Sequence, residues 1–161
     1  MKITFKSQGR FFAEVAIIAS LYAVLTVVLP ISYGPIQFRI AEALIVLVCF
    51  RRSALPGLIV GCLIANLFSP FGLPDVIFGT LATAVGVGIV YKLRHRKIGW
   101  VMLPPLIANS LIVGIELTVF AGIPFWFSAG GVFLGEIVIL YGLGIPFYYA
   151  LKKMKFKQDI T

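Results

Sequence analysis

The sequence predicts an all-α integral membrane protein of six transmembrane helices, from its composition, its spacing of apolar segments and its placement of basic residues. Of the 161 residues, 60% are hydrophobic and 12% are charged, whereas about 25% are charged in an ordinary soluble domain. A soluble domain of this size leaves about a third of its unfolded surface in water, too much for this apolar content. We therefore expect a single membrane domain over residues 1–161, without an attached soluble enzyme domain.

Apolar segments separated by Pro, Gly or basic residues mark the expected spans. They cover residues 11–30, 38–50, 54–69, 74–92, 100–121 and 127–151. One long helix through the short second and third segments would bury Arg51 and Arg52 near the bilayer centre, at about 3 kcal/mol each. A hairpin that turns at Arg51-Arg52-Ser53 instead places both charges at an interface. Ser53 is then the expected N-cap, with Pro56 in the first helical turn.

The basic residues indicate the topology. With six spans, every one of the 14 Lys and Arg residues except Arg39 falls on the side of the two termini. Because basic residues are enriched in cytoplasmic loops, we expect both termini to be cytoplasmic. The formal charge of +8 then reflects topology and lipid headgroups, and we expect no nucleic-acid partner.

Eight polar side chains remain in the outer half of the expected bundle and are the candidate binding residues. They are Gln37, Arg39, Glu42, Asn66, Asp75, Asn109, Glu116 and Glu136. An intramembrane carboxylate is costly unless it is paired or hydrated, which makes it a functional candidate. Glu116 and Glu136 lie deepest, about 9 and 13 Å below the outer ends of their spans at about 1.5 Å per residue, and for them we favour function.

Structural roles are open for the others. Asp75 lies in the first turn of a helix, where the dipole favours a carboxylate. Glu42 follows Arg39 by three residues and could pair with it. Asn66 and Asn109 could hydrogen-bond neighbouring helices.

Small residues form a face on two of the expected spans. Ala16, Ala19 and Ala23 lie on one face of the first span, and Gly57 and Gly61 on one face of the third. Such faces allow helices to approach closely. For the third span we expect packing within the bundle, whereas the first could equally meet a separate membrane subunit.

The sequence lacks the motifs of an enzyme. It contains no G-x-x-x-x-G-K-[ST] phosphate loop, no H-E-x-x-H, no G-x-S-x-G and no cysteine–histidine cluster. Cys49 and Cys62 lie in apolar runs without metal-ligand spacing, and Gly142-Leu-Gly144 indicates a helix irregularity rather than a nucleotide loop. We expect no cofactor, no metal and no ATPase site.

Four stretches, taken in order, resemble the QueT family of queuosine-precursor transporters, which are S components of energy-coupling factor (ECF) importers. They are residues 30–44, 61–83, 109–116 and 135–136, and the resemblance extends over about 11–152. It implies an S component in a prokaryotic cell membrane that captures a 7-deazaguanine, in its cyano or aminomethyl form, from outside. A transmembrane T component and two ATPases then drive import. The resemblance also implies that an Ala-x-x-x-Ala face, matched by Ala19 and Ala23, meets the T component.

The ligand chemistry can be considered separately. A deazaguanine edge presents an N–H beside an exocyclic amine, which Glu116 or Glu136 could accept, while Gln37, Asn66 or Asn109 could donate to the carbonyl. A second carboxylate could offset the charge of an aminomethyl group. The outer loop expected to close over the ligand is Ile31–Arg39.

Three alternatives stay open. The chain could be an S component for another vitamin or a nucleobase-like micronutrient, because such components share a fold while their pockets diverge. It could also be a membrane scaffold that binds no solute, or a stand-alone proton-coupled carrier.

Overall fold

The computed structural model describes residues 5–154, and within that range the chain is helical without a strand, so the all-α prediction is confirmed. In chain order the helices are α1 (Phe5–Val27), η1 (Pro30–Ser32), η2 (Ile40–Cys49), α2 (Ala54–Asn66), α3 (Leu73–Leu93), α4 (Ile98–Val101), α5 (Leu103–Ala121), α6 (Phe125–Glu136), η3 (Ile137–Gly144) and α7 (Ile145–Lys153).

Four helical segments are long and apolar enough to cross a membrane. They are Gln8–Val27, Leu73–Leu93, Ile98–Ala121 and Phe125–Lys153. Two shorter apolar helices, Ile40–Cys49 and Ala54–Asn66, occupy the positions of the second and third expected spans. Six crossings therefore remain a prediction, which these six segments can accommodate.

The hairpin of η2 and α2 turns at Arg51-Arg52-Ser53, as expected. The first arm is a 3₁₀ helix of 10 residues, whose rise of about 2.0 Å per residue makes it about 20 Å long. Ser53 is in the N-cap position, but its hydroxyl caps no backbone group and instead donates to Glu14 Oε2 at 2.8 Å. The predicted side-chain cap is therefore wrong, because Glu14 of α1 competes for that hydroxyl and also pairs with Arg51.

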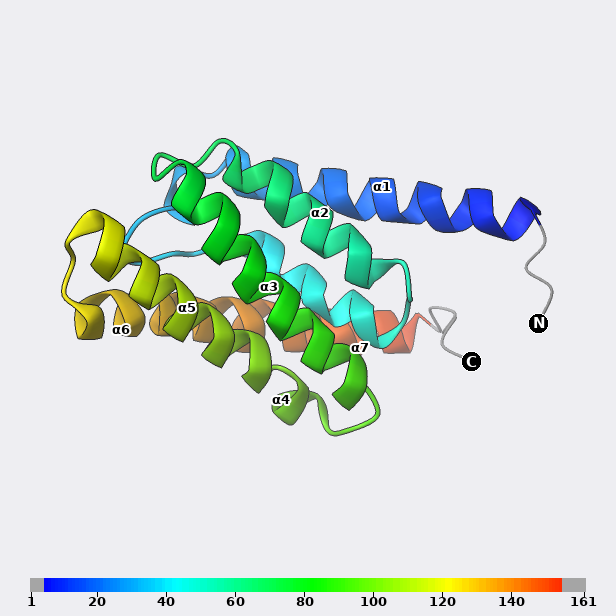
Figure 1. The fold of residues 1–161 in the computed structure, drawn as a ribbon. Helices are drawn as coiled ribbons and strands as arrows, with labels where there is room; N and C mark the ends of the chain where they lie inside the picture. The colour runs from blue at the N-terminus through cyan, green and yellow to red at the C-terminus, as the bar shows by residue number, and fades with distance from the viewer. Residues whose placement is uncertain (1–4, 155–161) are drawn as a thin grey trace.

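The two ends of the bundle differ in charge (Figure 1). One end, the basic end, holds the N-terminal part of α1, the η2–α2 turn, the α3–α4 connection and the C-terminal part of α7. Apart from Arg39, every Lys and Arg in residues 5–154 belongs to these segments or, in the case of Lys92, to the last turn of α3 that leads into them. Lys2, Lys155 and Lys157, expected at this end, lie outside the described residues. The other end, the loop end, holds the α1–η2, α2–α3 and α5–α6 connections.

Glycines set the close packing of α2 on α1. A Cβ placed on Gly61 would lie 2.7 Å from the Cβ of Tyr22 and 2.8 Å from the carbonyl oxygen of Ala19, so only glycine fits. Ala19 and Ala23 are buried at 4% and 9% exposure, and Ala16 is exposed. Ala19 and Ala23 therefore contribute to the packing of α1 within the bundle. That the face of Ala16, Ala19 and Ala23 meets a T component stays a prediction.

Helix α6, the segment η3 and helix α7 follow one another without a break, and the middle segment is π-helical. Helix α6 passes into the π-helical segment η3 and then into α7, with Gly142 and Gly144 inside η3 and Pro146 at the second position of α7. Pro146 has no N–H to give to the preceding turn. The expected irregularity at these glycines is confirmed.

Candidate functional site

The eight candidate polar residues are all buried, and together they form what we call the polar cluster. Their exposures are Gln37 4%, Arg39 4%, Glu42 0%, Asn66 0%, Asp75 0%, Asn109 5%, Glu116 1% and Glu136 5%. The loop before η2, η2 itself, α2, α3, α5 and α6 contribute them. None of these side chains faces lipid, so the bundle gathers its costly groups inside, as expected of functional or paired residues.

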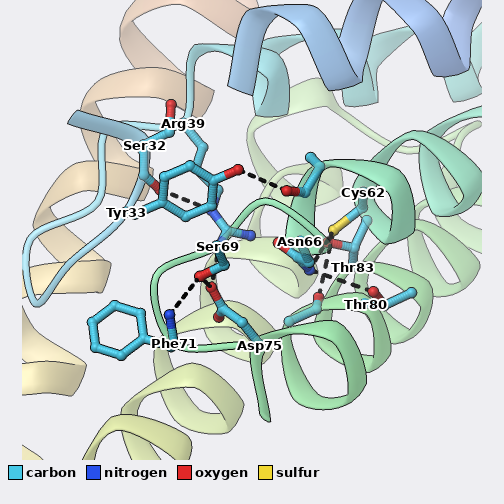
Figure 2. Close-up of polar contacts among 12 residues, drawn as sticks. Ser32, Tyr33, Arg39, Cys62, Asn66, Ser69, Phe71, Asp75, Thr80 and Thr83 are labelled. Atoms are coloured by element: carbon cyan, nitrogen blue, oxygen red, sulfur yellow. Dashed lines mark hydrogen bonds and ion pairs between the residues drawn. The ribbon is translucent and has the colours of Figure 1, made fainter. Parts of the chain in front are cut away.

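Arg39 is held from several sides at the loop end (Figure 2). Its Nε donates to the carbonyl oxygen of Ser32 at 3.1 Å, and its Nη2 lies 3.7 Å from Oδ2 of Asp75. The guanidinium carbon is 5.7 Å from the centre of the Tyr33 ring, and Asp75 also accepts a hydrogen bond from the Ser69 hydroxyl. Asp75 thus lies in the first turn of α3, as predicted, and also has a buried cation beside it.

Glu42 has a partner that the sequence spacing did not indicate. Its carboxylate accepts a hydrogen bond from the phenol of Tyr22 on α1. The ion pair between Glu42 and Arg39 that their spacing allowed is not formed, because the guanidinium is turned toward Asp75 and the carbonyl of Ser32. Glu42 therefore ties η2 to α1.

Amide side chains join further helices to the cluster. Asn109 Nδ2 on α5 donates to Glu136 Oε1 on α6 at 2.6 Å. Asn66 Nδ2 lies 3.4 Å from both the Cys62 sulfur and the Thr80 hydroxyl (Figure 2). Both asparagines thus make the interhelical contacts that were one of their two open interpretations, and the carbonyl oxygen of Asn66 is left without a partner.

Glu116 is the residue of the polar cluster whose two carboxylate oxygens both lack a hydrogen-bond partner. Its side chain is 1% exposed, yet neither carboxylate oxygen has a partner with acceptable hydrogen-bond geometry. The carboxyl group of Asp75 is close enough to interact with it, and so is the charge of Arg39. Two carboxyl groups therefore lie together next to one guanidinium.

Buried polar atoms that make no hydrogen bond, here called unpaired, gather at this site; Arg39 Nη2 is one of them although it forms an ion pair with Asp75. The unpaired acceptors are Glu42 Oε2, Asn66 Oδ1, Asp75 Oδ1, both Glu116 oxygens and Glu136 Oε2; the unpaired donors are Gln37 Nε2 and Arg39 Nη2; the unpaired hydroxyls are those of Ser32 and Ser128. Among the described residues, the further such atom is Arg94 Nε, on the far side of the bundle at the basic end. An unsatisfied buried polar group costs about 1–3 kcal/mol, so a ligand that paired these atoms would gain correspondingly.

The loop of residues 31–39 lies directly against α6. A Cβ on Gly131 would be 2.2 Å from the carbonyl oxygen of Pro35, and one on Gly135 would be 1.8 Å from that of Gln37. Only glycine at these two positions allows the contact. It fixes the backbone that carries Gln37 and, two residues later, Arg39.

Sequence reasoning missed the neighbours that orient the cluster, namely Tyr22 and Ser69. Tyr22 carried a usable signal, because a tyrosine hydroxyl inside an apolar helix needs a partner when it is buried. Ser69 precedes Pro70 in a connection, and nothing in the local pattern distinguishes it from an ordinary turn residue.

Comparisons with known proteins identify the family to which the chain belongs. The model of the family described as "QueT transporter" matches residues 12–153. The chain belongs to the QueT transporter family. A relative, the queuosine precursor transporter QueT of Lactococcus lactis subsp. cremoris, is 31% identical over an alignment of 151 positions, which covers 84% of this chain and 89% of the relative. No solved structure matches the chain. Family membership and the long apolar helices together make this QueT-family protein a multi-pass membrane transport protein.

Proposed function

We propose that this QueT-family protein is the substrate-binding S component of an ECF importer that takes up queuosine precursors of the 7-deazaguanine type. The observation that carries the proposal is the polar cluster, with its unpaired acceptors and donors enclosed in an apolar bundle. The name of the Lactococcus relative supplies the substrate class.

The unpaired atoms favour a ligand that is rich in hydrogen-bond donors. Six unpaired oxygens belong to carboxylates or to Asn66, against two unpaired nitrogen donors, on Gln37 and Arg39. A 7-deazaguanine presents an N–H and an exocyclic amine side by side, which a carboxylate such as that of Glu116 accepts together, as it accepts a guanidinium. Gln37 or Arg39 then donates to the carbonyl of the base.

The charge of the cluster favours the aminomethyl form over the cyano form. Glu42, Asp75, Glu116 and Glu136 supply four buried carboxyl groups, while Arg39 is the buried cation among them. A buried charge is costly unless it is paired. An ammonium group on the ligand would meet this need, whereas a nitrile would add a further acceptor.

The charge difference between the two ends supports the orientation. We infer that the six apolar segments cross the cell membrane of a prokaryote, with the basic end and both termini in the cytoplasm. The loop end, with the 31–39 loop and the polar cluster, then faces the outside.

As the resemblance to ECF S components implies, energy for import would come from partners, a T component and two ATPases, and the absence of a phosphate loop from this sequence fits that division of labour. The alternatives differ in their behaviour. A stand-alone carrier would move substrate in vesicles that contain this chain alone, driven by a proton gradient. An S component for another vitamin would fail to support growth of a mutant that cannot make deazaguanines, and a scaffold would bind neither ligand.

Calorimetric titration of the purified protein tests the proposal. We expect both 7-deazaguanines to bind, with the aminomethyl form tighter by at least about tenfold, which is about 1.4 kcal/mol. Binding of neither ligand more tightly than about 1 mM would contradict the substrate assignment. Tighter binding of the cyano form would contradict the charge argument alone.

Glu-to-Gln variants, which keep the size of the side chain and remove its charge, identify the carboxylates that accept hydrogen bonds from the ligand. Glu116→Gln and Glu136→Gln should each weaken binding by about 1–3 kcal/mol, or about 5- to 150-fold, if the carboxylates accept ligand hydrogens. Glu14→Gln is the matched control, because Glu14 pairs with Arg10 and Arg51 at the basic end. Unchanged affinity in both cluster variants would remove these residues from the site.

A further inference from the structure

A groove lies away from the polar cluster, on the outer surface of α3, α4 and α5. It has a volume of about 940 Å³. Its walls are apolar side chains that face away from the bundle, among them Ile89 at 39%, Ile107 at 49% and Leu111 at 48% exposure. Helices α3 and α5 approach each other closely at Gly86, where a Cβ would be 2.8 Å from the Pro105 Cα.

The groove ends at a basic surface. Arg96, Lys97 and Trp100 line its end, and the same three residues also line an adjoining hollow of about 860 Å³ at the basic end. His95 and Lys152 line that hollow as well. Among the described residues, no Asp or Glu lines either space.

The basic surface is fixed in place on the bundle. The Tyr141 hydroxyl of η3 donates to the carbonyl oxygen of Gly99 in α4 at 2.8 Å. This bond holds the short helix that carries Trp100 and directly follows Arg96 and Lys97. The side chains of Arg96, Lys97 and Trp100 are exposed, and no ion pair within residues 5–154 engages either cation.

We propose that the groove and the adjoining hollow form a binding site for an anionic phospholipid. One acyl chain lies along the apolar groove between α3 and α5, and the phosphate and anionic headgroup lie against Arg96, Lys97 and Lys152. Basic pockets between transmembrane helices at a membrane surface bind acidic headgroups in this way, and a tryptophan is favoured at that depth. The site requires only that the apolar helices span a bilayer, and it is independent of the substrate in the polar cluster.

Trp100 itself reports occupancy of the site. The chain has two tryptophans, so Trp126→Phe leaves Trp100 as the sole tryptophan, whose emission can be excited selectively above the absorption of the tyrosines. The variant is reconstituted in phosphatidylcholine vesicles that contain a minor fraction of either dibrominated phosphatidylglycerol or dibrominated phosphatidylcholine. We expect the brominated phosphatidylglycerol to quench Trp100 at least about twofold more at equal mole fraction, as a local excess of acidic lipid requires.

Control variants distinguish a specific lipid-binding site from non-specific attraction to acidic lipid. Trp100→Phe leaves Trp126, 85% exposed near the loop end, which both brominated lipids should quench equally. Adding Arg96→Ala and Lys97→Ala to the Trp126→Phe chain should abolish the preference, whereas adding Arg52→Ala, at the same end but outside the groove, should preserve it. Equal quenching of Trp100 by the two lipids in the Trp126→Phe chain would overturn the proposal without any further variant. So would a preference that survives loss of Arg96 and Lys97, which would indicate non-specific attraction only.

Discussion

Arg39→Met is expected to destabilise the protein by about 3–5 kcal/mol, the cost of removing one partner from a buried ion pair. The guanidinium is 4% exposed and lies 3.7 Å from Asp75, which is fully buried. Methionine keeps the length and apolar character of the side chain, but it leaves Asp75 and the neighbouring Glu116 without their buried cation. The variant should also weaken ligand binding, because the guanidinium can no longer donate a hydrogen bond to the carbonyl of the base.

Thermal and denaturant unfolding in detergent measure this effect. Arg52→Met is the matched control, since Arg52 is exposed at the η2–α2 turn and should change stability by less than about 0.5 kcal/mol. The double variant Arg39→Met with Asp75→Asn should recover part of the loss, because an amide needs no countercharge. Equal stability of Arg39→Met and Arg52→Met would show that Arg39 does not compensate the buried acids.

Gly135→Ala is expected to displace the 31–39 loop from α6 and to weaken ligand binding by at least about tenfold, or about 1.4 kcal/mol. The new Cβ would be 1.8 Å from the carbonyl oxygen of Gln37, far inside van der Waals contact. Overpacking of this kind costs about 1–3 kcal/mol. The loop can escape the clash by moving outward, which takes Gln37 and Arg39 away from the cluster.

Gly130→Ala provides the control on the same helix. Nothing lies within 4 Å of a Cβ at Gly130, and alanine is favoured over glycine inside a helix by about 0.5–1 kcal/mol. This variant should therefore bind ligand normally and be as stable as the parent or slightly more so. Ligand titration and thermal unfolding measure the affinity and the stability of both variants. Normal ligand binding by Gly135→Ala would mean that the contact between the loop and α6 does not position the binding site.

Much of the architecture followed from the sequence because a bilayer limits what an apolar chain can do. Apolar length predicted the helical segments, and the cost of buried charge placed the turn at Arg51 and Arg52. The same cost predicted that the eight polar residues would be enclosed, and all of them are buried. These inferences use one segment at a time, which is why they needed no knowledge of helix packing.

The contacts that the sequence did not predict are those that depend on which helices are neighbours. The alanine face of α1 packs closely on α2, with Gly61 against Ala19, a contact between helices that the sequence did not assign. Arg39 pairs with Asp75 across the bundle rather than with Glu42 nearby in sequence. Tyr22, which donates to Glu42, is 20 residues away along the chain. Local spacing carries no information about such contacts between helices.

A crystal or electron-microscopy structure of the protein with 7-aminomethyl-7-deazaguanine tests the central claim most directly. The account predicts that the base lies within hydrogen-bond distance of Glu116 or Glu136, enclosed beneath the 31–39 loop, with at least one of the now unpaired acceptors on its amine groups. A ligand bound elsewhere, such as in the groove between α3 and α5, with the polar cluster closed as before, would contradict it.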